Sequence, residues 1–99
     1  MVKLLMSWNI RQGRESEYFE FIVQEFGPEL AKLGVKVTEA WYTAYGERPQ
    51  ILTGGVVEDL DTMRGIVATE EWRTLKVKLL TYVTDYKQKI IRASGGFQL

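Results

Sequence analysis

Few side chains in this protein can perform chemistry, because two common reactive types are missing. The 99 residues contain no cysteine and no histidine. Their absence excludes disulfides, thiolate nucleophiles and thiolate metal sites, and it removes the commonest general base and metal ligand. Proton transfer would have to use a carboxylate, a tyrosine or a lysine. Most hydrolase and metalloenzyme classes are therefore disfavoured.

The charged clusters have simpler explanations than a binding site. Glu58, Asp59 and Asp61 could hold a hard cation, but they lack the spacing of a calcium loop, and Asp59 or Asp61 can cap a helix. Lysine and arginine total 13, as do aspartate and glutamate, so no positive excess favours nucleic acid. A basic strip is interpreted as a solvated face: Lys76, Lys78, Lys87, Lys89 and Arg92. Neither a metal site nor a nucleic-acid partner is expected.

Aromatic residues and a glycine pair are further candidates. Trp41, Tyr42 and Tyr45 fall in one predicted strand, and Trp41 and Tyr45 share a face that could line an apolar cavity or an interface. Interface packing is the favoured interpretation. Gly54 and Gly55 lie inside another strand, where glycine is unfavourable. A β-bulge or tight packing of a helix over the sheet is favoured there over the close approach of a ligand.

Hydrophobic periodicity predicts the elements that position these residues. Alternating or β-branched residues predict strands over 4–10, 35–45 and 51–57. The apolar face of the first strand is expected to pack on helices, and it holds Leu4, Met6, Trp8 and Ile10. One face of the second strand is expected to hold Val35, Val37, Trp41 and Tyr45. A three- to four-residue period predicts an amphipathic helix over 15–33, with Gly34 in the left-handed position after its end. Its apolar stripe holds Tyr18, Phe19, Ile22, Phe26, Leu30 and Leu33. A kink or break is expected at Gly27 and Pro28, because proline in a helix interior costs about 3 kcal/mol.

The remaining chain predicts a second helical region and a last strand. The helical region begins at Asp59 or Asp61, and Thr69 can cap a second start. One apolar stripe is expected to hold Trp72, Leu75, Leu79, Tyr82 or Val83, and Tyr86. The last strand is predicted over 87–93.

This succession predicts one ferredoxin-like α+β domain over residues 1–99. Two strand–helix–strand units give a four-stranded antiparallel sheet with both helical regions on one face. The other face cannot be purely polar, so a monomer would expose a large apolar patch, and a homodimer through that face is expected. The apolar stretch near Met1 is too short for a signal peptide or a membrane span, so a cytoplasmic location without a membrane partner is expected.

The chain also resembles a known superfamily over roughly Lys3 to Arg92. The residues that carry the resemblance are Leu33, Gly34, Trp41, Gly46, Asp59, Leu60, Glu71, Trp72, Leu75 and Leu79. The pattern is similar to the dimeric α/β-barrel superfamily, closest to NIPSNAP-like proteins and next to antibiotic-biosynthesis-monooxygenase-like ones. Its members include cofactor-free oxygenases, heme-degrading enzymes, isomerases and proteins without a defined activity, so the resemblance implies the fold more strongly than a function.

The resemblance implies three candidate catalytic residues: Asn9, Trp72 and Tyr82. Monooxygenase members carry an asparagine on the first strand and a tryptophan on the second helix, while heme-degrading members add a histidine near the position of Tyr82. Because that histidine is missing, no cofactor is expected. In a cofactor-free route, a deprotonated phenol or quinol passes an electron to oxygen, and Asn9 and Tyr82 hydrogen-bond the oxyanion. The favoured interpretation is nevertheless structural, with Trp72 and Tyr82 in a packed stripe and Asn9 at a strand end.

Three functions are thus carried forward. The first is a homodimeric barrel of undetermined activity that binds a small apolar or aromatic molecule. The second is a cofactor-independent monooxygenase acting on an aromatic or quinol-like substrate. The third is an effector-binding regulatory module.

Overall fold

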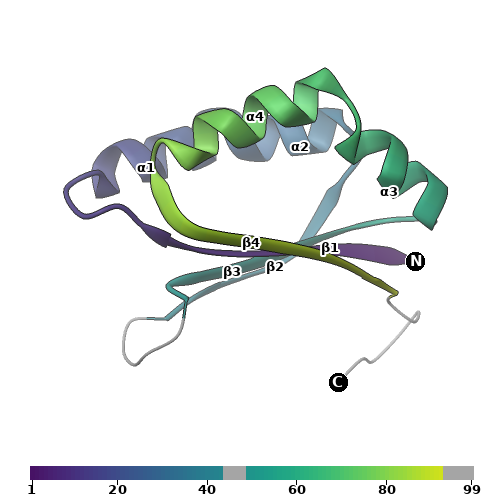
Figure 1. Cartoon of the computed structure of the whole chain (residues 1–99), viewed down its shortest axis with the longest axis horizontal. Helices are drawn as coiled ribbons and strands as arrows, with labels where there is room; N and C mark the ends of the chain where they lie inside the picture. Colours follow the sequence, from purple (N-terminus) through teal and green to yellow (C-terminus); the bar gives the residue numbers. More distant parts are fainter. Residues whose placement is uncertain (44–48, 93–99) are drawn as a thin grey trace.

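The computed structural model describes residues 1–43 and 49–92, which form one sheet with helices on a single face (Figure 1). Along the chain the elements are β1 (Val2–Ile10), α1 (Glu15–Phe21), the π-helical turn η1 (Ile22–Phe26), α2 (Gly27–Lys32), β2 (Lys36–Tyr42), β3 (Ile51–Val57), α3 (Leu60–Val67), α4 (Glu70–Leu80) and β4 (Val83–Arg92). The strands are antiparallel in the order β2-β3-β1-β4. This is the predicted ferredoxin-like α+β arrangement.

β1 is a central strand that pairs with β3 on one side and β4 on the other. Its alternation of buried and half-buried residues follows the sequence pattern closely. The buried set faces the helices: Val2, Leu4, Met6, Trp8 and Ile10. Because strand side chains alternate between faces, this single pattern decides which side of the sheet receives the helices.

α1, η1 and α2 form one uninterrupted helical segment, and Pro28 explains the π turn within it. Proline has no N–H, and in an α-helix its ring collides with the carbonyl four residues earlier. Here Gly27 donates its N–H to the carbonyl of Ile22, five residues back, so the turn before Pro28 is wider. The predicted disturbance at Gly27 and Pro28 is therefore a π turn rather than a break. Gly34 has φ of +93° and ends the segment as predicted.

A β-bulge in β2 reverses the facing of the aromatic residues after it. Val37 pairs with Gly55 and Glu39 pairs with Gly54, which leaves Thr38 as the extra residue. Val37 therefore faces the helices, whereas Trp41 pairs with Leu52 and projects to the other face. The prediction of one shared face for both was wrong, because one inserted residue shifts the two-residue period. Tyr45, predicted to share a face with Trp41, lies outside the described residues.

Gly54 and Gly55 are explained by close packing opposite this bulge. A Cβ atom on Gly55 would lie 2.4 Å from Cγ1 of Val35. One on Gly54 would lie 2.7 Å from Oε1 of Glu39, whose carboxylate pairs with Lys3. A bulge occurs here as favoured from the sequence, in β2 opposite the glycines, but the close contacts come from Val35 and from neighbouring strands rather than from a helix.

The second helical region begins as predicted, but it ends earlier. The side chain of Asp59 accepts a hydrogen bond from Thr62 N at 2.8 Å, and that of Thr69 accepts one from Trp72 N at 3.1 Å, so both are N-caps. β4 begins at Val83, not at residue 87. Tyr86 therefore belongs to β4 and not to the helical stripe. The apolar spacing of residues 83–86 also fits a helix, but pairing with β1 makes this stretch part of the strand.

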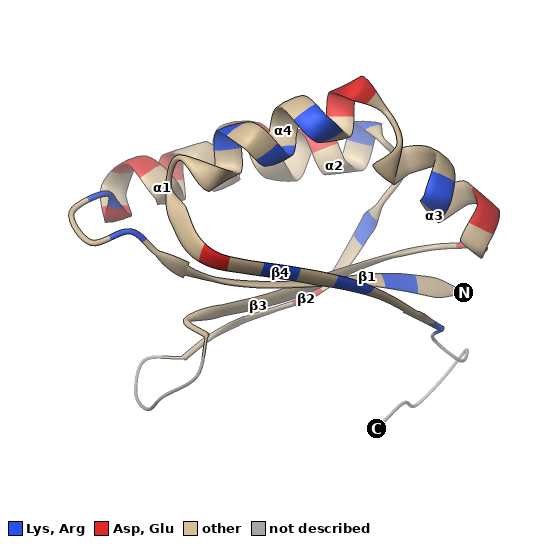
Figure 2. Ribbon diagram, viewed as in Figure 1, with Lys and Arg blue, Asp and Glu red and all other residues tan. Residues whose placement is uncertain are grey.

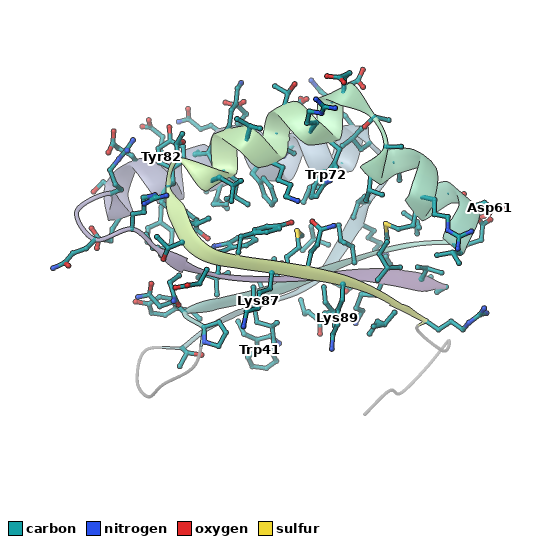
Figure 3. The ribbon with its side chains drawn as sticks, viewed as in Figure 1. Trp41, Asp61, Trp72, Tyr82, Lys87 and Lys89 are labelled. Atoms are coloured by element: carbon teal, nitrogen blue, oxygen red, sulfur yellow. The ribbon has the colours of Figure 1, made fainter. Side chains whose placement is uncertain are left out.

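The face of the sheet away from the helices is here called the open face. Strand register places on it Lys3, Leu5, Ser7 and Asn9 of β1, Glu39 and Trp41 of β2, Leu52, Gly54 and Val56 of β3, and Lys87, Lys89 and Ile91 of β4. Trp41 is 64% exposed and Leu52 is 42% exposed. Figure 3 shows Trp41, Lys87 and Lys89 projecting from this side. The open face thus carries exposed apolar side chains, as expected from the sequence, together with lysines.

Candidate functional site

An apolar pocket of about 340 Å³ lies between the α1–η1–α2 segment and strands β2 and β3. We call it the apolar pocket. Its deepest side chains are buried, and they are Trp8, Tyr18, Phe26, Leu30, Ile51 and Thr53. Its exposed rim includes Phe19 of α1 and Val37, Trp41 and Tyr42 of β2. A concave, mostly aromatic lining with a few polar groups is typical of a small-molecule site.

The π turn η1 shapes the helical wall of the apolar pocket. Ile22 and Phe26 at its two ends line the pocket, as does Gly27 immediately after it. π turns occur frequently at functional sites, because the wider turn displaces the backbone and its side chains from the α-helical path. Pro28 therefore affects the pocket indirectly, by favouring the π turn that places Phe26 against Trp8.

Trp8 and Tyr18 form the polar contact at the bottom of the pocket. Nε1 of Trp8 donates a hydrogen bond to the Tyr18 hydroxyl at 2.9 Å, and the rings meet edge to face at 6.5 Å. Burial raises the pKa of the Tyr18 phenol, and the hydrogen bond from Trp8 partly lowers it. The phenol therefore stays protonated at neutral pH. The Trp8 ring also stacks against that of Tyr86, with centroids 5.9 Å apart and planes parallel to within 8°.

The stability of the protein is expected to fall above about pH 10, where free phenols ionise. Burial also raises the pKa of Tyr86, so the unfolded chain ionises Tyr18 and Tyr86 more readily than the folded one. Their contribution to the free energy of unfolding is complete below the pKa that the tyrosines have in the unfolded chain. As the pH rises past that pKa, the contribution is lost by up to about 1.4 kcal/mol per pH unit for each group. Urea titrations from pH 9 to 11 should show a shallower decline in Tyr86→Phe than in the wild type. Equal slopes would contradict the assignment to Tyr86.

The structure does not bring the three predicted catalytic residues together. Trp72, 3% exposed, lies in the first turn of α4, whereas Tyr82 follows the end of that helix, about 15 Å further along at 1.5 Å per residue (Figure 3). Asn9 occupies an open-face position of β1. None of the three lines the apolar pocket. A catalytic role for them stays a prediction.

The contacts of each of these residues are structural. Asn9 accepts a hydrogen bond from Gln50 N at 2.9 Å and donates one to Asp85 at 3.0 Å, which joins β1 to β3 and to the bulge in β4. Tyr82 packs on Phe21, with ring centroids 5.2 Å apart, and lies beneath the guanidinium of Arg14 at 4.9 Å. The Asn9 amide is thus already engaged at both of its ends.

Tyr18 is the pocket residue that the sequence did not single out. The amphipathic pattern placed it correctly on the buried stripe of a helix, beside Phe and Ile residues. A hydroxyl on such a stripe needs a buried hydrogen-bond partner. This requirement is the feature of the sequence that could have identified Tyr18. The partner itself, Trp8, is ten residues away in another element, and only the packing of α1 on β1 brings the two together.

The basic strip expected from the sequence is divided between different surfaces. Lys87 and Lys89 lie on the open face, whereas Lys76 and Lys78 belong to α4 on the other side (Figure 2). Lys78 pairs with Glu25, and Lys76 lies 5.0 Å from the ring centre of Tyr86. In the part of the chain that the structure describes, no helix is long and apolar enough to cross a membrane.

Comparison with known proteins gives similarity in structure alone. No family model and no curated protein sequence matches the chain. A NIPSNAP domain protein from Burkholderia xenovorans has a TM-score of 0.72 at 11% identity, with 99% of each chain covered. A NIPSNAP family protein from Agrobacterium tumefaciens has a TM-score of 0.71 at 17% identity, with 95% of this chain and 93% of that one covered.

A protein described as a putative antibiotic biosynthesis monooxygenase, from Nitrosomonas europaea, is also similar. Its TM-score is 0.67 at 9% identity, with 94% of this chain and 98% of that one covered. Identities this low establish the fold and not the activity. They confirm, at the level of fold, the resemblance found in the sequence: the chain has the ferredoxin-like fold of the NIPSNAP proteins.

Proposed function

We propose that this protein is a homodimeric α/β barrel that binds a small apolar or aromatic molecule in the apolar pocket. The observation that carries the proposal is the pocket itself, about 340 Å³ in volume and lined mainly by aromatic and aliphatic side chains. Small-molecule sites are concave and lined mainly by apolar and aromatic side chains, so a pocket of this size and lining favours a ligand. The compartment stays a prediction, and the cytoplasm is the one expected.

The open face supports the homodimer. Trp41 and Leu52 are neighbours across β2 and β3, and both are exposed in the single chain. Glu39, whose carboxylate also pairs with Lys3 of its own chain, is on the β2 side of this face, while Lys87 and Lys89 are on the β4 side. A twofold axis parallel to the strands would set β2 over β4 of the second copy, so that opposite charges approach each other.

The monooxygenase alternative gains no support from a shared site, because Asn9, Trp72 and Tyr82 do not line one cavity. The apolar pocket is equally suited to the third function, an effector-binding module, since both require reversible binding of a small molecule. The proposal therefore concerns binding rather than a reaction.

The test is to fill the apolar pocket from its rim. Ala40 of β2 lines the pocket and is exposed, so Ala40→Phe places a ring there without disturbing the core. Equilibrium dialysis with 2-ethylnaphthalene should show saturable binding to the wild type and about tenfold weaker binding to the variant. Ala31→Phe is the matched control, because Ala31 is exposed on α2 and does not line the pocket. Absence of saturable binding, or equal loss in both variants, would contradict the proposal.

A further inference from the structure

The Tyr18 hydroxyl has an unused hydrogen-bonding capacity inside the apolar pocket. Its oxygen accepts the hydrogen bond from Trp8 Nε1, and the side chain is 2% exposed. Among the described residues, the one hydrogen bond found for this hydroxyl is the one it accepts from Trp8, so the phenolic hydrogen is available to donate. A buried donor without an acceptor is unfavourable by about 1–3 kcal/mol. A ligand oxygen placed beside Tyr18 would relieve that cost.

The remaining lining of the pocket carries no formal charge. Among the described residues that line it, none is a lysine, arginine, aspartate or glutamate. The other buried polar group is the Thr53 hydroxyl, which donates to the Glu39 carbonyl at 2.8 Å. A carboxylate or phosphate would lose its hydration here without gaining a counter-charge, whereas a neutral carbonyl would lose little.

The volume and the aromatic lining of the pocket favour an aromatic molecule of one or two rings. Its volume is near the lower end of the range for small-molecule sites. Phe26 meets the Trp8 ring nearly perpendicularly, with an interplanar angle of 86° and centroids 5.9 Å apart. Aromatic surfaces arranged in this way offer both ring faces and ring edges to an aromatic ligand.

We propose that Tyr18 is the specificity-determining donor of the apolar pocket and selects uncharged aromatic ligands that carry a carbonyl or quinone oxygen. The proposal rests on the proposed function, because it requires that the pocket binds a ligand. The phenol donates its hydrogen to the ligand oxygen while it still accepts from Trp8. This pair of hydrogen bonds through one hydroxyl holds the ligand by one end and leaves the rest of it in apolar surroundings.

The test compares three molecules of similar size: 2-acetonaphthone, 2-ethylnaphthalene and 2-naphthoate. One neutral hydrogen bond is worth about 0.5–1.5 kcal/mol, so the wild type should bind the ketone about three- to tenfold more tightly than the hydrocarbon. 2-Naphthoate should bind at least tenfold more weakly than the ketone. In Tyr18→Phe the affinity for the ketone should become about equal to the affinity for the hydrocarbon, while the affinity for the hydrocarbon itself is retained.

Tyr86→Phe is the matched control, because it removes a half-buried phenol that donates to Gln88 and does not line the pocket. The wild-type ratio of the two affinities should persist in this variant. Two results would overturn the role of Tyr18 but leave the proposed function standing. One is binding of all three molecules with equal wild-type affinities for ketone and hydrocarbon, and the other is an unchanged ratio of these affinities in Tyr18→Phe. Absence of binding of all three overturns the proposed function instead. If Tyr18→Phe does not fold, the wild-type ratio still decides the question.

Discussion

Replacing Trp41 with serine should convert the proposed homodimer into a monomer at micromolar concentration. The side chain is 64% exposed in the single chain, and tryptophans buried at the centre of an interface commonly contribute about 2 kcal/mol or more. A twofold pair loses the residue twice, so we expect the dissociation constant to rise by roughly a thousandfold, or about 4 kcal/mol. Sedimentation equilibrium of the wild type and the variant over a range of concentrations measures this change.

Val77→Ser is the control for this prediction. Val77 is 59% exposed, like Trp41, but it lies on α4, which covers the opposite face of the sheet. Its replacement should leave the association unchanged. A wild type that sediments as a monomer at tens of micromolar, or equal dissociation constants for wild type and Trp41→Ser, would show that the open face does not carry the dimer.

Replacing Gly55 with alanine should lower the free energy of unfolding by about 1–3 kcal/mol, the usual cost of overpacking a core. The new Cβ would lie 2.4 Å from Val35 Cγ1 and 3.3 Å from the Lys36 carbonyl oxygen. Val35 is buried and the carbonyl belongs to the backbone, so neither can move away without a wider shift. Urea denaturation measures this loss. It is a large fraction of the free energy of unfolding, because small domains have a total of only about 5–15 kcal/mol.

The same substitution at Gly65 gives the opposite expectation. Gly65 lies within α3 and is exposed, and an alanine Cβ there would have no atom within 4 Å apart from those of its own helix and chain neighbours. Alanine should therefore raise the free energy of unfolding by about 0.5–1 kcal/mol, because it lowers the conformational entropy of the unfolded chain. If the two variants changed stability equally, the contact with Val35 would not be the cause.

Local sequence signals were enough for the elements whose ends depend on their own residues. The capping of α3 by Asp59 and of α4 by Thr69 needs only a side chain three residues before the N–H that it satisfies. Gly34 ends the first helical segment because few other residues adopt positive φ without strain. The alternation of β1 likewise predicted its buried face, since successive side chains of a strand point to opposite faces of the sheet.

The candidate site was less predictable than the fold. The sequence indicated the apolar face that contains Trp8 and the helical stripe that contains Tyr18, but not the hydrogen bond between them. The residues named from the family resemblance, Asn9 and Trp72 among them, lie outside the pocket. Spacing along one element says which residues share a surface, whereas a site is made where surfaces from different elements meet.

What the sequence determined by itself was the order of the elements, the helix-facing side of β1 and the absence of thiol and imidazole chemistry. The tertiary structure alone decided that the Thr38 bulge turns Trp41 outward, that β4 begins at Val83, and that Tyr18 meets Trp8. The physical reason is the range of the forces involved. Caps and periodicity act within a few residues, whereas strand register and pocket geometry depend on contacts between segments that only folding brings together.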